Sequence, residues 1–430
     1  MSRILFLMPQ LPYPPQQGAA LRNYSLVIGL ARQGHVIDLL TVHELEEREG
    51  SSSAGVFDEA NAPALADGLM PLAACCRRII AVEPPRRSTL ARARDTLLQP
   101  LPDMALRLTT DALQTQFARL LAREHYDVLQ VEAIEMIPCA LPKPGQPRGA
   151  RPGVFIFDAH NAEYVLQRRA CLADARHPGR WHGAAYSLIQ WQKLVRYERR
   201  ICQAADHVIA VSEADRLALQ RLQPGLKVTV IPNGVSLEFY RPEKTAPAAL
   251  RRPALVFTGK MDFRPNVDAV RWFVAEVWPL IQLRRPEAHF YIVGQKPHAQ
   301  VQALAGTPGL VITGRVPDVR PYLAGADLCV GPLRIGGGTR LKVLEAMAMG
   351  LPVVSTHLGC DGFPFVDDRE ASLADDPPAF AEAVLALLAD PARAGAMARA
   401  ARAYVTAHYG WDSILSELAR LYPESAVAHV

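Results

Sequence analysis

The chain has 430 residues, of which 50% are hydrophobic and 21% are charged, and its 47 basic and 43 acidic side chains leave a net charge of +4. At roughly 100–200 residues per domain, this length predicts two domains or three small ones, each with its own core. The composition excludes a mainly disordered chain, and no apolar run approaches the ~18–20 residues that span a bilayer.

The first half of the chain alternates short apolar strands with helical patterns. Arg3–Met8 is expected to form a strand, followed by a proline- and glycine-rich loop and a helix that ends at Gly34. Strand, helix and strand in succession form a βαβ unit, which predicts a parallel sheet. Residues 44–70 are weakly periodic and are expected to be a variable excursion. The other strands expected here are Val36–Thr41, Arg78–Val82, Val128–Glu132, Val154–Asp158, His207–Val211 and Val228–Pro232.

The alternation of strand and helix restarts after a proline-rich stretch, Asn233–Pro253, which is typical of an interdomain connection. Strands are expected at Ala254–Gly259, His289–Gly294, Leu310–Thr313, Asp327–Pro332 and Pro352–Thr356. Helices are expected at about 267–283, 298–305, 318–325, 339–349, 377–389 and 391–408. The pattern predicts two doubly wound α/β domains facing across a cleft, which is the default position for a site.

We place the domain boundaries by these patterns. Residues 1–235 are expected to form the first domain, 236–253 the linker and 254–405 the second domain. Residues 406–430 are expected to form a C-terminal helix that packs back on the first domain.

The most informative motif is GPLRIGGGTRLKVLEAMAMGLPVV, at Gly331–Val354. Glycines between a buried strand and a helix let backbone N–H groups approach a ligand, and the helix N-terminus favours an anion. Arg340 and Lys342 are unfavourable to the helix dipole, which indicates that an anion is supplied from outside. Glu345 could accept hydrogen bonds from sugar hydroxyls. The alternative is a tight turn that needs the glycines only.

Two further loops follow predicted strands and carry polar groups. Gly259–Asn266 (GKMDFRPN) places Lys260 and Arg264 where α/β folds bind ligands, although solvated surface cations would show the same pattern. Val154–Asn161 (VFIFDAHN) ends in Asp158, His160 and Asn161, and a single histidine there is more often structural than catalytic.

Several familiar site signatures are absent from the sequence. It contains no G-x-G-x-x-G, P-loop, HExxH or GxSxG motif, which argues against a dinucleotide-dependent dehydrogenase, a P-loop nucleotidase, a zinc protease and an α/β-hydrolase. No Asp-x-Asp ends an apolar strand, and none of the seven cysteines belongs to a Cys-x-x-Cys pair. We therefore expect no metal site and no cofactor. Dispersed cysteines indicate reduced thiols and a cytoplasmic protein.

Taken together, these motifs resemble the retaining glycosyltransferases of family 4, or group 1, which have the GT-B fold of two Rossmann-like domains. The resemblance covers nearly the whole chain, and its finer wording is similar to the exopolysaccharide and exosortase-associated branch. It rests on Gly18, Arg22-Asn23, Gly34–Val36, Ala205–Asp215, Ile231–Val235, Gly259–Asn266, Gly314–Val316 and Gly336–Val354.

The resemblance implies a site that binds a nucleotide-diphosphate sugar. Glu345 matches the second glutamate of the family's E-x7-E motif, expected at the donor ribose, and Lys260 matches a cation expected at the diphosphate. His160 is expected at the transferred sugar near its 6-position, and Gly18 leaves room beneath the first loop. The remaining donor-binding positions that it implies are Arg264, Arg315, Val316, Gly337, Gly338, Thr339, Arg340 and Lys342.

One position departs from the family pattern. The first motif glutamate should stand eight residues before Glu345, and Gly337 occupies that position. The prediction is therefore a hexosyltransferase acting on a glycan or polyprenyl-diphosphate-linked acceptor. A non-catalytic sugar-nucleotide-binding partner and a GT-B-type sugar-nucleotide epimerase remain as alternatives.

The small net charge hides two basic stretches in the first domain. Residues 77–94 carry six arginines and one glutamate, and residues 160–203 carry eight basic and three acidic side chains. Trp181, Tyr186, Trp191 and Tyr197 lie among the cations of the second stretch. This pattern suits an anionic membrane surface at the inner membrane face, or equally a solvated helical face with its aromatics in the core. Nothing else in the chain supports nucleic-acid binding.

Overall fold

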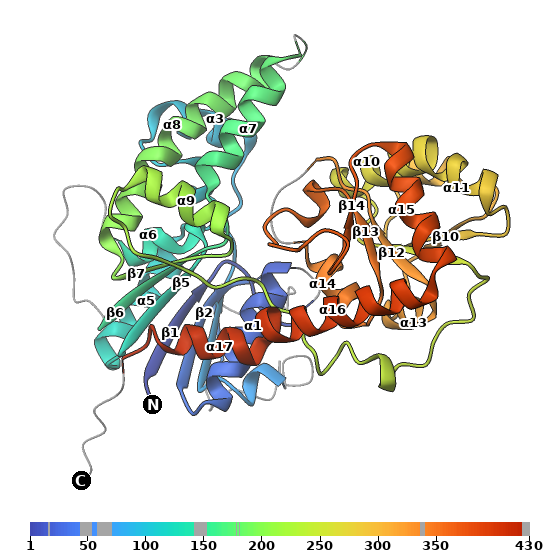
Figure 1. The fold of residues 1–430 in the computed structure, drawn as a ribbon. Coiled ribbons are helices and arrows are strands. Elements are labelled where there is room, and N and C mark those ends of the chain that lie inside the picture. The colour runs from blue at the N-terminus through green and yellow to red at the C-terminus, as the bar shows by residue number, and fades with distance from the viewer. Residues whose placement is uncertain are drawn as a thin grey trace, which may run out of the picture. The chain divides into compact units, whose positions relative to one another are not determined.

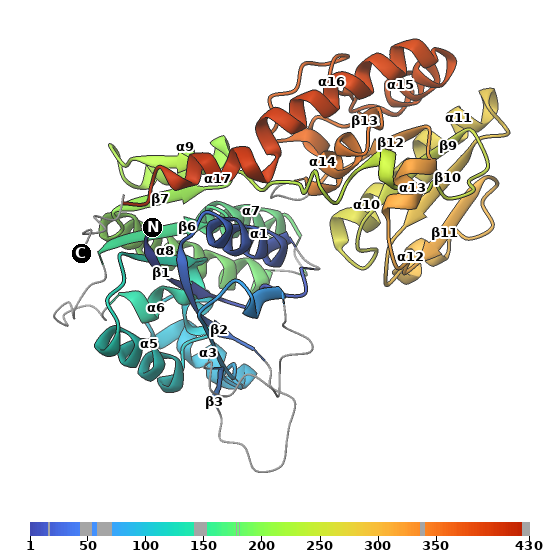
Figure 2. The same ribbon diagram turned by 90° about the horizontal axis from the view of Figure 1, so that it is seen from below.

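The fold is seen in a computed structural model that describes residues 1–15, 18–43, 71–141, 153–177, 179, 181–335 and 340–423, with the backbone of 54–57. The chain divides into two compact units, one formed by Met1–Pro232 with Leu415–Val430 and the other by Asn233–Ile414. Each unit is a mainly parallel sheet with helices against it (Figures 1 and 2). The predicted fold class, two Rossmann-like α/β units of the GT-B type, is confirmed.

The sheet of the first unit has the order β3-β4-β2-β1-β5-β6-β7-β8. Its strands are β1 (Arg3–Met8), β2 (Val36–Val42), β3 (Ala54–Phe57), β4 (Arg78–Val82), β5 (Val128–Glu132), β6 (Val154–Ala159), β7 (His207–Ala210) and β8 (Val228–Val230). All pair in parallel except β3, which is antiparallel to β4 at one edge. The strand β3 lies inside residues 44–70, where the sequence predicted no strand, because four residues of an edge strand carry too little pattern.

The helices of the first unit cover both faces of this sheet. They are α1 (Gly18–Arg32), α3 (Thr89–Leu98), α4 (Asp103–Leu106), α5 (Asp111–Arg123), α6 (Ile137–Ala140), α7 (Glu163–Ala175), α8 (Trp181–Ala204) and α9 (Glu213–Leu222). The hydroxyls of Ser88, Thr110 and Ser212 cap the N-termini of α3, α5 and α9. The central strands are buried throughout, as expected for parallel strands covered on both faces.

The last segment of the chain completes the first unit. Helix α17 (Trp411–Ala419) packs where α1 has Gly29, since a Cβ at this glycine would lie 2.1 Å from Leu415 Cδ1. The glycine thus permits the close approach of the two helices. Residues 406–430 are divided among the end of α16, the helix α17 and the tail beyond it.

The second unit contains a six-stranded parallel sheet in the order β11-β10-β9-β12-β13-β14. Its strands are β9 (Ala254–Thr258), β10 (His289–Val293), β11 (Leu310–Gly314), β12 (Leu328–Gly331), β13 (Val353–Ser355) and β14 (Ser372–Leu373). Its helices are α10 (Arg264–Trp272), α11 (Trp278–Arg284), α12 (Ala299–Gln302), α13 (Arg320–Gly325), α14 (Leu341–Ala348), α15 (Pro377–Ala389) and α16 (Pro391–Tyr409). A π-helical turn, Phe273–Val277, joins α10 to α11, so that the single helix expected at 267–283 has three parts.

The stretch from Asn233 to Pro253 belongs to the second unit in the structure. The N–H of Val235 donates to the Tyr409 carbonyl at 2.8 Å, and the N–H of Ala248 donates to the Pro321 carbonyl at 2.8 Å. Its residues are therefore held by backbone hydrogen bonds to the elements that follow. Among the described helices, none is long and apolar enough to cross a membrane.

Candidate active site

The glycine-rich motif lies between the carboxyl end of β12 and the start of α14. Gly337, Gly338 and Thr339 fall outside the described residues. Arg340 is buried and stands at the N-cap position of α14, where its Nε donates to the Leu358 carbonyl at 3.2 Å. The Arg340 guanidinium, whose role the sequence left unexplained, therefore stabilises the turn at Leu358–Cys360.

Lys342, in the first turn of α14, joins the two loops that the sequence singled out. Its Nζ donates to Asn266 Oδ1 at 2.5 Å and lies 4.2 Å from the centre of the Phe257 ring. Asn266 in turn donates from Nδ2 to the Lys260 carbonyl at 2.9 Å. Burial lowers the pKa of Lys342 to about 7, because the charged ammonium loses hydration that these contacts do not replace.

Gly259 makes this arrangement possible at the carboxyl end of β9. Its φ of +154° is rare for residues with a side chain. A Cβ there would lie 2.7 Å from Asn266 Nδ2 and 3.0 Å from Lys342 Nζ. Any side chain would displace the amide or the ammonium, so that the glycine is required by both geometry and space.

Glu345 lies one turn further along α14 and meets a residue far away in the sequence. Its carboxylate lies near the hydroxyl of Tyr240, which is buried. Burial raises the pKa of Glu345, while the Tyr240 hydrogen bond and the charge of Lys342 oppose that shift. Burial also raises the pKa of the Tyr240 phenol, and the neighbouring carboxylate adds to this effect.

The other cations predicted at the donor site are more exposed. Lys260 follows β9 and pairs with Asp262 at 3.7 Å, with half of its side chain exposed. Arg264 is exposed at the first residue of α10, and Arg315 is exposed after β11. Val316, next to Arg315, packs against the core that includes Val343 and Leu344. The structure thus links Lys342 through Asn266 to the main chain of Lys260, whose ammonium points to Asp262.

In the first unit, His160 follows β6 and is paired with a strand residue. Its Nε2 lies 2.9 Å from Glu132 Oε2, at the carboxyl end of β5. Burial alone would lower the pKa of His160, but the hydrogen bond and charge of Glu132 and the charge of Asp158 raise it above its usual value. Gly18, the other predicted residue of this unit, begins α1 and is exposed.

A buried ion pair lies beside this histidine. Arg22, on α1, donates from Nη2 and Nε to Asp158 Oδ2 at 2.6 and 3.1 Å, and both side chains are at most 1% exposed. Burial raises the pKa of Asp158, and the guanidinium of Arg22 opposes the rise. Glu132 and Asp158 each carry a carboxylate, and Arg22 supplies one fixed positive charge. The net charge of these groups is therefore zero when His160 is protonated.

Glu132, Asp158 and His160 each offer an atom within 4.8 Å of the others, which is the spacing of a metal-ligand set. The fit to a metal is poor because the Arg22 guanidinium already supplies a cation to Asp158 and His160 already bonds Glu132. We assign no metal to these residues.

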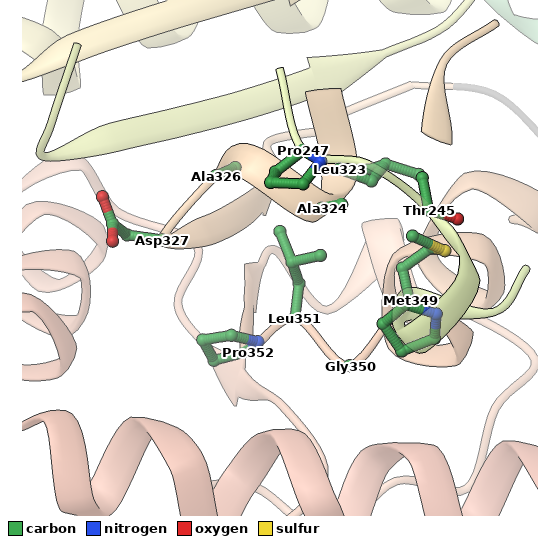
Figure 3. Close-up of a pocket in the computed structure, with 11 residues that line it drawn as sticks. Thr245, Pro247, Leu323, Ala324, Ala326, Asp327, Met349, Gly350, Leu351 and Pro352 are labelled. Atoms are coloured by element: carbon green, nitrogen blue, oxygen red, sulfur yellow. The ribbon is translucent and has the colours of Figure 1, made fainter. Parts of the chain in front are cut away.

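The second unit also contains a pocket of about 210 Å³, shown in Figure 3. Asp327 and Pro352, which line it, precede β12 and β13 and therefore lie at the amino ends of these strands. Ligands of open α/β sheets bind at the carboxyl ends. The pocket thus lies at the opposite end of the strands from Lys342 and Gly259.

Comparison with known families decides the assignment. Residues 17–239 match the model described as Glycosyltransferase Family 4, and residues 252–390 match that of Glycosyl transferases group 1. The chain belongs to glycosyltransferase family 4. The exopolysaccharide and exosortase-associated branch is a finer assignment that these matches do not address.

Individual relatives agree with the family. The chain is 31% identical over 246 residues to the GDP-mannose-dependent alpha-(1-6)-phosphatidylinositol monomannoside mannosyltransferase of Mycobacterium tuberculosis, covering 51% of this chain and 62% of that protein. It is 29% identical to the D-inositol 3-phosphate glycosyltransferase of Streptomyces avermitilis, covering 54% of each. The matches therefore span less than two thirds of these relatives.

Solved structures share the fold over the whole chain. Sucrose-phosphate synthase from Thermosynechococcus elongatus has a TM-score of 0.66 at 18% identity and covers 98% of both chains. The Anabaena protein HepE, solved with UDP and glucose, has a TM-score of 0.62 at 14% identity, covering 98% of this chain and 99% of that one. At these identities the likeness concerns the fold.

Sequence reasoning missed several residues that the structure adds to the site. Asn266 and Arg22 stood inside quoted motifs, but no pattern showed that they bond Lys342 and Asp158. Tyr240 and Glu132 gave no signal, since Tyr240 is far from Glu345 in sequence and Glu132 was the last residue of an expected strand. These partners are distant in sequence and meet only in the tertiary structure.

The buried ion pair gives a stability prediction. Replacing the cation (Arg22→Met) should destabilise the first unit by about 3–5 kcal/mol, because it leaves Asp158 buried and unpaired. Urea denaturation followed by circular dichroism measures this loss, and the double variant Arg22→Met/Asp158→Leu should recover part of it. The exposed Arg119→Met on α5 should change stability by less than about 0.5 kcal/mol. Equal effects of Arg22→Met and Arg119→Met would contradict the role of the pair.

Proposed function

We propose that this protein transfers a hexosyl group from a nucleotide-diphosphate sugar to an acceptor hydroxyl with retention of configuration, in the synthesis of exopolysaccharide or another cell-surface glycan. The observation that carries the proposal is the Lys342–Asn266–Gly259 arrangement at the carboxyl ends of β9 and β12, in a chain of family 4. A partly desolvated ammonium beside a glycine loop and a helix N-terminus suits a diphosphate. The UDP and glucose in the Anabaena structure are consistent with this ligand class.

The donor groups divide into two roles. Lys342 and the exposed Lys260 and Arg264 bind the diphosphate. Glu345, beside Tyr240, accepts hydrogen bonds from the ribose hydroxyls.

The chemistry follows from where charge develops. The bond between the anomeric carbon and the diphosphate oxygen breaks as the bond to the acceptor oxygen forms on the same face. The departing phosphate oxygen takes the acceptor proton, so that atoms and charge balance. Cations at the diphosphate stabilise the negative charge that grows on it, an effect worth about 3–4 kcal/mol for one preorganised donor. In the first unit, His160 meets a hydroxyl of the transferred sugar through its Nδ1.

Two alternatives remain, a non-catalytic sugar-nucleotide-binding partner and a sugar-nucleotide epimerase. Gly337 in place of the first motif glutamate favours the former. Thermal shift with UDP, GDP and their sugars identifies the nucleotide. Release of the nucleoside diphosphate with and without a lipid-linked acceptor then separates transfer from binding alone, and sugar isomerisation without release identifies an epimerase.

Two substitutions test the transfer reaction. Lys260→Ala and Glu345→Gln should each lower kcat/KM by about 100-fold or more, since each removes a charge that the transition state or the ribose uses. Nucleoside diphosphate release measures the rate. The exposed lysine variant Lys244→Ala, in the same unit, is the matched control and should keep wild-type turnover. Near-normal rates in both site variants would overturn the assignment.

The pKa of Lys342 predicts proton uptake on donor binding. Because this pKa is about 7 in the free protein, the amine is mostly neutral at pH 8, and a bound diphosphate should favour its charged form. The affinity for UDP or GDP should therefore fall as the pH rises from 7.5 to 9, by up to about tenfold per unit.

Calorimetry in two buffers of different ionisation enthalpy measures the proton uptake directly. Lys342→Met should abolish it, whereas Lys244→Met should retain it. An unchanged proton count in Lys342→Met would assign the uptake to another group.

For the acceptor, we propose a lipid-linked glycan at an anionic membrane surface. The support comes from α3, α7 and α8, which pack together at one end of the first unit (Figure 1). Leu90, Leu97 and Leu98 of α3 are each more than 70% exposed, and they share one helix face with Arg94. On α7 and at its C-cap, exposed Arg168, Leu172 and Arg176 follow one another at four-residue spacing. The mycobacterial relative is named as a phosphatidylinositol monomannoside mannosyltransferase.

The structure also corrects the charge argument made from the sequence. Most cations of residues 77–94 are neutralised within the unit, as Arg77 pairs with Asp38, Arg78 with Glu124, and both Arg87 and Arg92 with Asp103. Of the four aromatic side chains in the second stretch, Tyr197 is buried while Trp181 is 63% exposed. The surface we propose therefore rests on the leucines of α3, the arginines of α7 and Trp181.

Liposome co-sedimentation tests this surface. The triple variant Leu90→Ser/Leu97→Ser/Leu98→Ser should lose most of its binding to vesicles containing phosphatidylglycerol, because the apolar contact is removed while the charge is kept. Leu283→Ser changes an equally exposed leucine in the second unit and should bind as the wild type does. Binding that is independent of anionic lipid, or equal in the triple variant and the control, would exclude this surface.

A further inference from the structure

The end of the chain reaches the site of the first unit. Beyond α17, Tyr422 is only 6% exposed, and its ring lies 5.5 Å from that of His35. The next residue, Pro423, accepts a hydrogen bond at its carbonyl from Ser2 Oγ at 2.9 Å. The last described residues are therefore fixed against the start of β1 and the end of α1.

From this position Tyr422 begins a chain of hydrogen bonds that ends at His160. Its hydroxyl donates to Gln130 Oε1, although the two residues are 292 positions apart. Gln130 Nε2 donates to Glu132 Oε1 at 2.6 Å, and the other oxygen of Glu132 meets His160 Nε2 at 2.9 Å. Gln130 and Glu132 are both fully buried, so that each link is strengthened by the low local dielectric.

The strand period explains how two polar residues reach this place together. Gln130 and Glu132 are two apart on β5 and share one face, whereas Leu129 and Val131 face the apolar core on the other. The register of β5 with β6 sets Glu132 opposite Asp158. The polar face of β5 thus carries Glu132 beside Asp158, and the C-terminal tail covers this face at Gln130.

The direction of the donors matters for His160. A phenol that donates to the amide oxygen turns the amide nitrogen toward Glu132, where it donates in turn. Both carboxylate oxygens then act as acceptors, so that His160 Nε2 carries a proton. The other ring nitrogen, Nδ1, is left to meet the sugar.

We propose that Tyr422 and Gln130 are positioning residues, which hold the Glu132 carboxylate so that His160 presents Nδ1 to the transferred sugar. The C-terminal tail is then part of the working site of the first unit. The proposal rests on the proposed transferase function for its kinetic consequence. The competing explanation is that Tyr422 is only an anchor, whose ring and neighbouring Ser2 contact hold the tail in place.

The variant Tyr422→Phe separates these explanations, since it keeps the ring and removes only the hydroxyl. We expect kcat to fall about tenfold, with KM for the nucleotide sugar changed less than twofold. Tyr126→Phe is the matched control, because the Tyr126 hydroxyl, just before β5, is also buried and donates to a carboxylate, Asp38 Oδ2, at 2.6 Å. It should lower the melting temperature to a similar degree and leave kcat unchanged.

A second readout does not depend on activity. In ¹⁵N-histidine-labelled protein, at a pH high enough for the imidazole to be neutral, the His160 ring, assigned with His160→Gln, should show one tautomer protonated at Nε2. In Tyr422→Phe and in Gln130→Met the ring should give averaged shifts of two tautomers, whereas Tyr126→Phe should match the wild type. If no donor is turned over at all, this spectrum still tests the relay while the transferase proposal fails separately. Wild-type ring shifts in both relay variants, or wild-type kcat in Tyr422→Phe, would overturn the proposal.

Discussion

The first unit depends on one buried cation. Arg22 reaches from α1 to Asp158 on β6, and its Nη1 also donates to the carbonyls of Ile231 and Pro232 at 3.0 Å. A guanidinium without solvent must satisfy its donors within the protein, because the cost of an unpaired buried charge is several kcal/mol. One side chain therefore ties together a helix, a central strand and the residues by which the chain leaves the unit. The charged group around His160 is built on this fixed point.

In the second unit, the cation Lys342 is left with fewer partners than Arg22 has in the first. Lys342 is partly buried and receives one amide oxygen and the face of an aromatic ring, and no carboxylate forms an ion pair with it among the described residues. Its charge is therefore incompletely stabilised until an anion arrives. A site that leaves a cation short of partners gains more from a diphosphate than one whose cation is already neutralised, as Arg77 is by Asp38.

The sequence was sufficient for most strands and for the loops that follow them, because hydrophobic period and glycine position are local signals, but it missed the short edge strands β3 and β14. Helix α15 and strand β1 lie at the predicted bounds. It was not sufficient for pairings set by tertiary folding, such as Tyr240 with Glu345 or Tyr422 with Gln130. It also overstated the basic surface, since Arg78 and Glu124 are far apart in sequence and neutralise each other only in the fold. Counting charges along the sequence does not show ion pairs between distant residues.

The return of the tail has a consequence for how the protein is made. The first unit is discontinuous, because the later part of α17, from Leu415, and Tyr422 belong with residues that leave the ribosome about 190 positions earlier. At about 5–20 residues per second, the sheet of the first unit waits roughly 10–40 s for its last helix. During that time the face of α1 at Gly29 and the polar end of β5 are uncovered, while the second unit, which is continuous, can fold as it emerges. Completion of the first unit thus requires that residues as late as Tyr422 have been synthesised.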